Sequence, residues 1–592
     1  MYQYTDFDKQ FVKLRAQQFR DQLERWQRGE LSDEQMLPLR LQNGWYIQRY
    51  APMARIAVPY GEISSLQLRT LGRIAREYDQ PSPELLAHAQ ATQDALEASQ
   101  PGATLAAAPL KYGYGHFSTR TNCQFNWIPI TRAADVMDLL ASVHMHGIQT
   151  SGNDIRNITC DALEGIAEDG IVDCRPFAEI TRQWSSLHPE FSYLPRKFKI
   201  AFNGAREDRA AIGWYDIGLQ ALKNDAGEVG FTVKVGGGMG RTPIIGTTVR
   251  EFLPWAELLN YIEAIIRVYN GYGRRDNKWK ARIKILVKSE GQAFITAVEK
   301  EYRDIVELDG APHRITQAEL DRVTSHFVVP ELKPANLPSK VDPQGQLYQR
   351  WLAQNVRGHR LTGMKTVTLS FKRLGFAPGD ADAYTLDALA QLAEQFSASE
   401  ARLTHEQNLL LPWVFEADLP ALYEAARRLG LAQPNIGLLT DMIACPGGDF
   451  CSLANARSLH IADAVTERYQ DLDELFDLGP IDLHMSGCIN SCGHHHSGHI
   501  GILGVDKDGK EWYQVTLGGA DGSQLSGPAI GGKVVGPAFT AAEVPGVIEA
   551  LLDTYRELRH PGEFFIDALR RIGHDPFKQA ANAARHAKAE AL

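Results

Sequence analysis

The sequence predicts a mixed α+β (mixed α/β) protein that is internally duplicated, with two similar halves related by pseudo-two-fold symmetry. Runs of residues typical of strands alternate with runs of helical period along the whole chain. Short segments also recur in the same order at a spacing of about 286 residues, close to half of the 592-residue chain. A chain of this length exceeds what one hydrophobic core supports, so we expect three or four domains.

The duplication depends on matches that fall at nearly one offset. Residues 118–127 (STRTNCQFNW) align without a gap with residues 404–413 (THEQNLLLPW), 286 positions later. The other matches are Cys160 with Cys445, at 285 positions, and residues 262–269 with 548–555, at 286 positions. Each match alone is weak, but their common order and offset indicate a true repeat.

The repeat predicts the order of the domains. An N-terminal helical arm covers 1–40. The first copy consists of a half-domain at 41–135 and a larger domain at 136–330, and a linker at 331–350 follows it. The second copy consists of a half-domain at 351–420 and a larger domain at 421–575, and a tail covers 576–592. Residues 80–108 are rich in Ala, Gln and Pro and lack a counterpart in the second copy. We therefore expect an inserted surface segment there, with a helix between flexible ends.

Within these domains both kinds of regular structure are expected. Strand-like runs cover residues 54–60, 197–202, 230–235, 281–287, 365–371 and 499–505. Amphipathic helical runs cover residues 63–78, 255–269, 384–396 and 546–558. This mixture argues against an all-α fold.

Composition limits the classes of function. A net charge of −10 argues against nucleic acid as the main partner. The first residues lack the apolar core of a signal peptide, and no apolar run is long enough to span a membrane, so we expect no membrane association and a cytoplasmic location. Seven cysteines, an odd and small number, argue against a disulfide framework.

Four of the seven cysteines lie within 48 positions, in glycine-containing loops. Cys445 and Cys451 form C-x5-C in ACPGGDFC, and Cys488 and Cys492 form C-x3-C in GCINSC. Such a group indicates a metal centre, because a lone cysteine is more often a small buried hydrophobe. The spacing differs from zinc ribbons and from ferredoxins, and the preference for an iron–sulfur cluster over structural zinc depends in part on the family resemblance given next. The remaining cysteines are assigned no role: Cys123, Cys160 and Cys174.

These residues resemble the siroheme-dependent nitrite and sulfite reductase family, whose signature contains a Cys-x-Asn-x-Cys core like that of residues 488–492. The resemblance covers roughly residues 40–305 and 360–560. It implies three domains around a siroheme and a [4Fe–4S] cluster. It also implies ferredoxin-like half-domains at 41–135 and 351–420, with siroheme, substrate and cluster bound by 136–330 and 421–575.

The resemblance also implies roles for individual residues. The cluster ligands are Cys445, Cys451, Cys488 and Cys492, and the sulfur of Cys492 also ligates the siroheme iron. The substrate-binding cations are Arg120, Arg156, Lys197 and Lys199. The further siroheme contacts are Arg196, Gln407, Asn408 and Asn490. Independently of the family, Lys197 and Lys199 alternate in a predicted strand and share one face, which favours an anion between them.

The implied reaction is the six-electron reduction of sulfite to sulfide in sulfur assimilation and cysteine biosynthesis. Reduction of nitrite to ammonia with the same cofactors is the nearest alternative, and nitrite-type members typically carry Asn where this chain has Lys199. A non-catalytic iron–sulfur or zinc protein is an alternative of another class. No flavin or nicotinamide domain is visible, so we expect a separate electron donor, either ferredoxin or an NADPH-dependent flavoprotein.

Three further segments attract attention. Residues 274–284 (RRDNKWKARIK) are basic and suit siroheme carboxylates, an acidic donor or plain solvent. Residues 236–241 (GGGMGR) do not fit G-x-G-x-x-G, and we expect no nucleotide site there. The run 494–496 consists of three histidines; in an extended segment adjacent side chains point to opposite faces, which argues against one shared metal.

Overall fold

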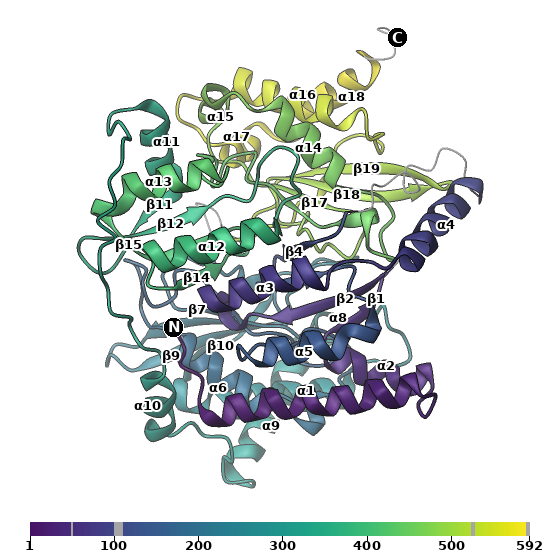
Figure 1. The fold of residues 1–592 in the computed structure, drawn as a ribbon, viewed down its shortest axis with the longest axis vertical. Helices are drawn as coiled ribbons and strands as arrows, with labels where there is room; N and C mark the ends of the chain where they lie inside the picture. The colour runs from purple at the N-terminus through teal and green to yellow at the C-terminus, as the bar shows by residue number, and fades with distance from the viewer. Residues whose placement is uncertain (49–50, 100–110, 523–526, 588–592) are drawn as a thin grey trace.

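We describe the fold from a computed structural model that covers residues 1–592 except 49–50, 100–110, 523–526 and 588–592. Over this part of the chain, helices surround four five-stranded sheets (Figure 1). Two of the sheets belong to the half-domains and two to the larger domains. The first half of the chain fills the lower part of the view and the second half the upper part. The predicted mixed, duplicated fold is confirmed.

The two smaller sheets exchange strands between the halves. One has the order β1-β2-β5-β4-β13 and the other β11-β12-β15-β14-β3. Their bounds are β1 Trp45–Ile47, β2 Pro52–Ala57, β3 Glu62–Ser64, β4 Tyr114–Phe117, β5 Asn122–Phe125, β11 Val356–Gly358, β12 Met364–Leu369, β13 Asp380–Asp382, β14 Glu400–Leu403 and β15 Leu409–Phe415. Because β3 pairs with β14 and β13 pairs with β4, the halves cannot separate without breaking two antiparallel ladders.

One hydrophobic core holds the two smaller sheets together. The helices α3 (Ser65–Glu77) and α12 (Ala383–Phe396) lie side by side over them in Figure 1. Leu71 of α3 and Leu389 of α12 are fully buried in this core. Each helix has an apolar stripe that faces the sheets, as the helical period of the sequence predicts.

The two larger sheets share one topology. Their orders are β10-β9-β8-β7-β6 and β16-β17-β18-β19-β20, with three parallel strands followed by two antiparallel ones in each. Their bounds are β6 Thr159–Cys160, β7 Ile200–Asn203, β8 Ile217–Lys223, β9 Val229–Val235, β10 Thr247–Pro254, β16 Ile443–Ala444, β17 Leu483–Ser486, β18 Ile500–Lys507, β19 Lys510–Leu517 and β20 Lys533–Val534. The equivalent helices α7 (Leu258–Tyr272) and α16 (Val544–Leu558) begin 286 residues apart.

The repeat extends to backbone detail in the two hairpin loops that the sequence aligned. In each loop the first residue donates its N–H to the carbonyl four positions later: Ser118 to Asn122 at 2.9 Å, and Thr404 to Asn408 at 3.0 Å. Each loop holds one residue in the left-handed region: Thr121 with φ 52° and Gln407 with φ 62°. We refer to residues 118–122 as the first loop and to residues 404–408 as the second loop.

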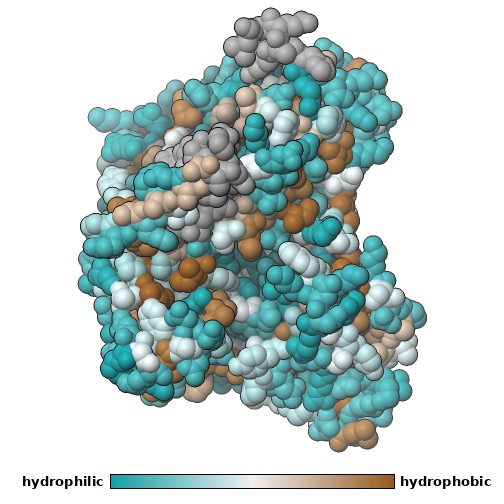
Figure 2. Space-filling model, turned by 90° about the vertical axis from the view of Figure 1, so that its right-hand side faces the viewer, coloured by the Kyte–Doolittle hydropathy of each residue, from teal (hydrophilic) through white to brown (hydrophobic). Residues whose placement is uncertain are grey.

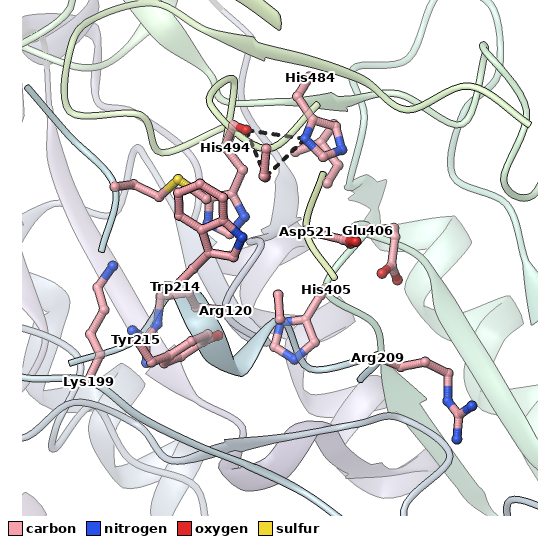
Figure 3. Close-up of a pocket in the computed structure, with 14 residues that line it drawn as sticks. Arg120, Lys199, Arg209, Trp214, Tyr215, His405, Glu406, His484, His494 and Asp521 are labelled. Carbon is pink, nitrogen blue, oxygen red and sulfur yellow. Dashed lines mark hydrogen bonds between the residues drawn. The ribbon is translucent and has the colours of Figure 1, made fainter. Parts of the chain in front are cut away.

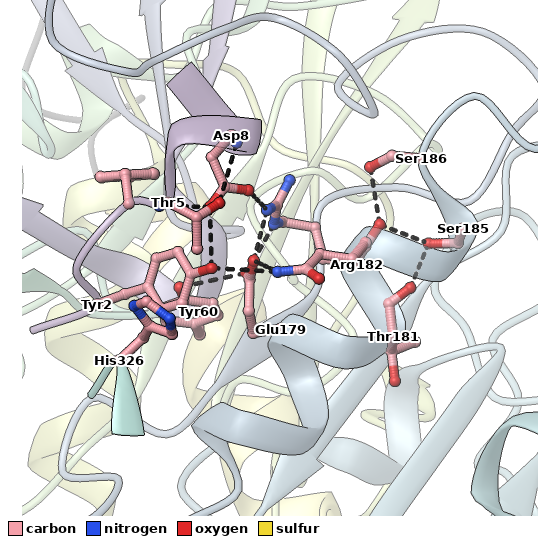
Figure 4. A network of polar contacts seen from close by, with 12 residues as sticks. Tyr2, Thr5, Asp8, Tyr60, Glu179, Thr181, Arg182, Ser185, Ser186 and His326 are labelled. Atoms are coloured by element: carbon pink, nitrogen blue, oxygen red, sulfur yellow. Dashed lines mark hydrogen bonds and ion pairs between the residues drawn. The ribbon is translucent and has the colours of Figure 1, made fainter. Parts of the chain in front are cut away.

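The N-terminal arm consists of α1 (Asp6–Gln27) and α2 (Asp33–Gln42). A buried polar network attaches it to α6 (Arg175–Ser185), as Figure 4 shows. Asp8 accepts a hydrogen bond from the hydroxyl of Tyr2 at 3.0 Å and forms an ion pair with Arg182 at 3.4 Å. Arg182 also pairs with Glu179, so the arm is fixed to the domain by paired, buried charges.

The predicted insertion contains the helix α4 (Pro83–Ser99), while residues 100–108 lie outside the described part of the chain. The predicted tail contains α18 (Asp575–Ala587), and α11 (Gln346–Asn355) begins inside the predicted linker. The remaining α-helices are α5 Ala133–Ala141, α8 Ile283–Glu290, α9 Gln292–Glu307, α10 Gln317–Ser325, α13 Leu419–Arg428, α14 Leu459–Arg468, α15 Leu472–Leu478 and α17 Phe565–Ile572.

One strand prediction was wrong. Residues 281–287 were expected to form a strand, yet helix α8 starts at Ile283. Ile283 and Val287 are buried and stand four residues apart, on one face of the helix. A short apolar run rich in Ile and Val does not distinguish a strand from a buried helix.

Among the described residues, no helix combines the length and apolarity that a bilayer crossing requires. Figure 2 shows the face on the right-hand side of Figure 1. Hydrophilic residues cover most of it, and hydrophobic ones form separate groups.

Candidate functional site

The four predicted cluster ligands lie in two loops that the second larger sheet brings together. Cys445 directly follows β16, and Cys488 follows β17 by two residues. These strands are parallel neighbours, so their carboxyl ends meet at one edge of the sheet. The N–H of Cys445 donates to the carbonyl of Met485 at 3.2 Å, and the N–H of Gly487 donates to Sγ of Cys445 at 3.2 Å.

The thiols are close enough to affect one another electrostatically. Burial raises the pKa of Cys445 to about 12, and the charges of Cys492 and Cys488 add to this rise. Burial likewise raises the pKa of Cys488 to about 11, with further contributions from Cys492 and Cys451. Thiolates gathered in this way repel unless cations lie between them.

The donor set fits an iron–sulfur cluster. Within the described residues, no three His, Cys, Asp or Glu side chains are arranged to hold a single metal ion. In a polynuclear cluster the four thiolates need not converge on one ion. Cys492 is the exposed member of the set, whereas Cys488 is buried.

The predicted substrate-binding cations lie next to the Cys492 loop. The hydroxyl of Thr119, in the first loop, donates to the carbonyl of Cys492 at 3.1 Å. Burial lowers the pKa of Lys197 to about 8; Arg156 lowers it further, and Cys492 opposes the shift. Burial and the neighbouring charge of Arg120 lower the pKa of Lys199 well below its ordinary value. The structure thus brings together the substrate cations and Cys492, which lie far apart in the sequence.

The two lysines precede strand β7 instead of lying in it. Phe198, between them, forms an isolated bridge with Ile155, so the segment is extended and its side chains alternate. The expectation that Lys197 and Lys199 share a face depends on this alternation. Both ammonium groups are in a buried, cationic environment, which an anion would neutralise.

Arg120 and Arg156 each keep an unsatisfied polar atom. Arg120 donates from Nη2 to the carbonyl of Asn157 at 2.8 Å, but its buried Nη1 has no hydrogen-bond acceptor. Burial lowers the pKa of Arg120 to about 10. Arg156 donates to the carbonyls of Thr150 and Gly152, while its Nε lacks a hydrogen-bond acceptor and lies 3.2 Å from Asp154. An unpaired buried donor such as Nη1 of Arg120 is costly, and a bound carboxylate or oxyanion would satisfy it.

Sequence reasoning missed Arg55, which lies on β2 beside Arg156. Its Nη1 donates to the carbonyl of Thr150 at 3.3 Å, the same carbonyl that accepts from Arg156 at 2.7 Å. Its Nε donates to the side chain of Gln124 at 2.8 Å. An arginine between buried neighbours in the strand segment ARIA was the available signal.

Tyr46 is a second missed residue in this cationic environment. Burial acts to raise its pKa, but Arg156, Arg55 and Lys197 outweigh this and lower it to about 8. A tyrosine hydroxyl surrounded by cations releases its proton more readily than usual, because the cations stabilise the phenolate.

The predicted basic segment 274–284 divides into two parts. Arg282 is held against Asp216 at 2.7 Å, and Asp216 also accepts the N–H of Lys199 at 2.9 Å. Lys284 donates to the carbonyls of Met239 and Thr242 at 2.7 and 2.6 Å, so the glycine-rich segment encloses a lysine of the chain itself. The other basic residues of the segment are exposed: Arg274, Arg275, Lys278 and Lys280.

The predicted siroheme contacts have different surroundings. Burial and the charges of Arg156 and Arg282 lower the pKa of Arg196, which places it in the same cationic group. Gln407 donates to the carbonyl of Phe117 at 3.2 Å and accepts from the N–H of Ala444 at 3.0 Å. Asn490 is exposed in the Cys492 loop.

Asn408 is engaged by protein groups at both ends of its amide. Its Nδ2 donates to Asp441 at 2.8 Å, and its Oδ1 accepts from the ammonium of Lys372 at 2.8 Å. The proposed roles of these four residues toward a siroheme remain predictions.

A cavity lies between the two halves of the chain, and the predicted substrate-binding residues Arg120 and Lys199 form part of its lining (Figure 3). Its volume is small, about 20 Å³. The first half contributes Arg120, Lys199, Arg209, Ala211, Trp214, Tyr215 and Met239, and the second half contributes His405, Glu406, Ile443, His484, His494, Ser497 and Asp521. The first half thus contributes positive side chains to the cavity, and the second half contributes histidines and carboxylates.

Of the three consecutive histidines at 494–496, one lines this cavity. His494 lines the cavity, whereas the rings of His495 and His496 lie 4.0 Å apart and His496 contacts the carbonyl of Gly240 at 3.1 Å. The segment is a turn, with φ 56° at His494. The extended geometry assumed from the sequence was therefore wrong, because this turn follows the Cys492 loop directly.

Comparison with known proteins agrees with this arrangement. The profile of a family described as the nitrite and sulphite reductase 4Fe-4S domain matches residues 151–305 and 438–588. The profile of a nitrite/sulfite reductase ferredoxin-like half domain matches residues 364–429. The chain is 27% identical to "Sulfite reductase [ferredoxin] 1" of Mycolicibacterium paratuberculosis, over 76% of this chain and 75% of that protein.

Relatives with a second activity are about as similar. The chain is 25% identical to "Ferredoxin--nitrite reductase, chloroplastic" of Arabidopsis thaliana, over 85% of this chain and 76% of that protein. The solved structure of the Mycobacterium tuberculosis NirA protein has the same fold, with a TM-score of 0.70 and 22% identity over 95% of this chain and 97% of that one.

Proposed function

Because the chain belongs to the nitrite and sulfite reductase family, whose members are oxidoreductases, we propose that it is an assimilatory sulfite reductase that converts sulfite to sulfide. A siroheme and a [4Fe–4S] cluster supply the electron-transfer and redox chemistry when bound. The observation that carries the proposal is the position of Lys199, a half-buried lysine in the cavity wall beside Arg120 and Lys197.

The residues of the chain divide the work. The thiolates of Cys445, Cys451, Cys488 and Cys492 hold the cluster. The substrate anion is attracted and oriented by Arg120, Arg156, Lys197 and Lys199, with Arg55 as an added member. Fixed positive charge at a buried site is commonly the largest contribution that a protein makes to such chemistry. The depressed pKa values of the lysines let them donate protons to substrate oxygen atoms as these leave as water.

Nitrite reduction to ammonia is the second candidate. It is supported by the similarity to a relative named as a nitrite reductase, which is about as close as the relative named as a sulfite reductase. Lys199 favours sulfite, because the resemblance implies that members of the nitrite type typically carry Asn at that position.

The electron donor we propose is ferredoxin, because the relatives of both kinds carry that word in their names. A flavoprotein that uses NADPH is the alternative donor. Reduced ferredoxin and an NADPH–flavoprotein system, each supplied to the same holoprotein, distinguish the two.

The test measures sulfide and ammonium production by the holoprotein with reduced ferredoxin. We expect kcat/KM for sulfite to exceed that for nitrite, and Lys199→Asn to reverse the preference. A wild-type protein that turns over nitrite far better than sulfite contradicts the assignment. A purified protein without the visible absorption of siroheme supports the non-catalytic alternative instead.

A further inference from the structure

The proposed reaction requires many protons at a buried site. Hydrogensulfite takes up six electrons and seven protons to give hydrogen sulfide and three molecules of water, and nitrite takes up six electrons and eight protons to give ammonium and two of water. Lys199 can donate a proton in each cycle, but a lysine that has donated must be protonated again. Its own wall of the cavity is cationic, with Arg120 and Arg282 among its neighbours. That wall attracts anions and repels protons.

The opposite wall of the same cavity carries carboxyl groups. Glu406 lies in the second loop, at the position that Arg120 occupies in the first, 286 residues earlier. In Figure 3, Lys199 and Glu406 lie at opposite sides of the cavity, with His405 between them. Burial raises the pKa of Glu406, and the charges of Asp441 and Asp521 raise it further, so the protonated acid persists at higher pH than in water.

A second acid connects Glu406 with the outside. Asp482 is close enough to Asp521 and Glu406 for their charges to raise its pKa, and it is partly exposed. Burial and the charge of Asp521 raise its pKa to about 7, which suits a group that binds and releases protons near neutral pH. Carboxylic acids with such values are rare on surfaces and are typical of sites that transfer protons.

His405 fixes the geometry between the two walls. Its Nδ1 lies 3.1 Å from the carbonyl of Thr119, and its Nε2 lies 3.2 Å from the carbonyl of Cys160. The ammonium of Lys372 holds the backbone carbonyl of Glu406 in place.

We propose that Glu406 is the proton-relay residue of this site: it passes protons across the cavity to Lys199 and is protonated again from Asp482. In each transfer Glu406 loses one proton as Lys199 gains it, and the ammonium then gives that proton to a departing substrate oxygen. The polar cavity, at about 20 Å³, has room for a bridging water, which would carry the proton over the remaining gap. This inference rests on the proposed function and adds the route by which its protons arrive.

The charged groups that face Glu406 come from several elements. They are His405 in the same loop, Lys372 and Asp441 from neighbouring loops, Asp482 before β17, and Arg209 and Asp521 on the cavity wall. The carboxyl groups raise the affinity of Glu406 for a proton, and the cations oppose them.

The test compares three variants of the holoenzyme in sulfite reduction. Glu406→Gln keeps the shape of the side chain but removes the acid, Glu406→Asp keeps an acid, and Glu557→Gln changes an exposed carboxyl on α16. We expect Glu406→Gln to lower kcat by about 100-fold with little change in KM, and to enlarge the solvent deuterium isotope effect. Glu406→Asp recovers part of the rate, and Glu557→Gln behaves like the wild type.

A readout independent of turnover follows the acid itself. The infrared absorption of a protonated carboxyl group, titrated from acidic to alkaline pH, should contain a component that is absent from Glu406→Gln and present in Glu557→Gln. The siroheme and cluster spectra and the melting temperature should be unchanged in Glu406→Gln.

The possible failures are distinguishable. If Glu406→Gln keeps the wild-type kcat and isotope effect while the wild type reduces sulfite, the relay is wrong and the proposed function stands. If the wild-type holoprotein reduces neither sulfite nor nitrite, the proposed function itself fails. If KM rises and kcat does not fall, Glu406 serves anion binding and not proton transfer.

Discussion

The first and second loops have the same backbone and opposite chemistry. Their ladder-closing hydrogen bonds agree to 0.1 Å, at 2.9 and 3.0 Å, and both place a residue in the left-handed region. The first loop carries Arg120, and the second carries Glu406 at the equivalent position. The two loops also touch each other, because His405 contacts the carbonyl of Thr119, its own counterpart 286 residues earlier. The pseudo-two-fold axis therefore passes between them.

The difference shows how a duplicated chain builds an asymmetric site from symmetric parts. The first copy supplies Lys199 just before β7, and the second supplies Asp482 just before β17. Where the first copy has Cys160 inside β6, the second has Cys445 after β16, in the metal-binding loop. Sheets and loops fix the positions in both copies, and under the proposed function the substitutions at those positions separate electron transfer, anion binding and proton supply.

The largest effect is expected from substituting the cysteines, which differ in position between the two copies. Cys492→Ser should abolish the iron–sulfur absorption and the reductase activity, because an exposed thiolate ligand is lost from a four-sulfur set. Cys160→Ser is the matched control from the first copy, since Cys160 aligns with Cys445 but is buried within strand β6. Iron and sulfide content and the visible spectrum measure both. A Cys160→Ser protein without a cluster contradicts the assignment of the metal to the second copy.

The next effect concerns the two charged loop residues. Arg120→Gln should lower kcat/KM for sulfite by about 100-fold, mostly through KM, because it removes a buried guanidinium that lacks an acceptor for Nη1. Glu406→Gln should instead lower kcat. Steady-state kinetics at several sulfite concentrations separates the two. An equal effect of both variants on KM shows that the loops do not differ in function.

The sequence predicted the cysteine centre and the repeat, because spacing and order along the chain are enough for both. It also predicted that Arg120, Arg156, Lys197 and Lys199 belong to one site, and the structure brings them to the Cys492 loop. Those assignments required the family resemblance, because no local pattern connects a hairpin loop with a segment before β7.

Arg55 and Asp216 could not be predicted in the same way. Arg55 looks like one charge in an apolar strand, and only the pairing of β2 with β5 places it beside Gln124. Asp216 is fully buried, and only the tertiary fold brings Arg282 to it. The strand predicted at 281–287 failed because a short apolar run suits either a strand or a helix.

The third effect compares the asparagines that first revealed the repeat. Asn408→Ala should lower the free energy of unfolding by about 2 kcal/mol, because Asn408 bridges the buried ions Lys372 and Asp441. Asn122→Ala should cost less, since Oδ1 of Asn122 is buried without a hydrogen-bond donor. Urea unfolding of both proteins tests this order. The reverse order contradicts the view that the second loop is the structurally fixed one.

The smallest effect is a pH dependence of the free energy of unfolding. We expect it from Asp482 in the second copy and not from an exposed aspartate in the first copy. In the unfolded chain an aspartate has a pKa of about 3.9, whereas burial and Asp521 raise that of Asp482 to about 7. Between these values the folded protein holds a proton that the unfolded chain has released. The free energy of unfolding therefore falls as pH rises and has lost this contribution above about pH 7. Asp482→Asn removes the ionisation.

We expect Asp482→Asn to gain on the order of 1 kcal/mol over the wild type between pH 5 and pH 8, in urea titrations of the two proteins. The expected gain in the free energy of unfolding is small for two reasons. Asp482 is partly exposed, and its carboxylate lies 3.4 Å from Nε2 of His499, which offsets part of the free-energy cost of ionising it. Asp225→Asn, on an exposed turn of the first copy, is the control and should show no such gain. An equal pH dependence in both variants assigns the slope to the protein as a whole, and Asp482 then does not bind the proton that the relay requires.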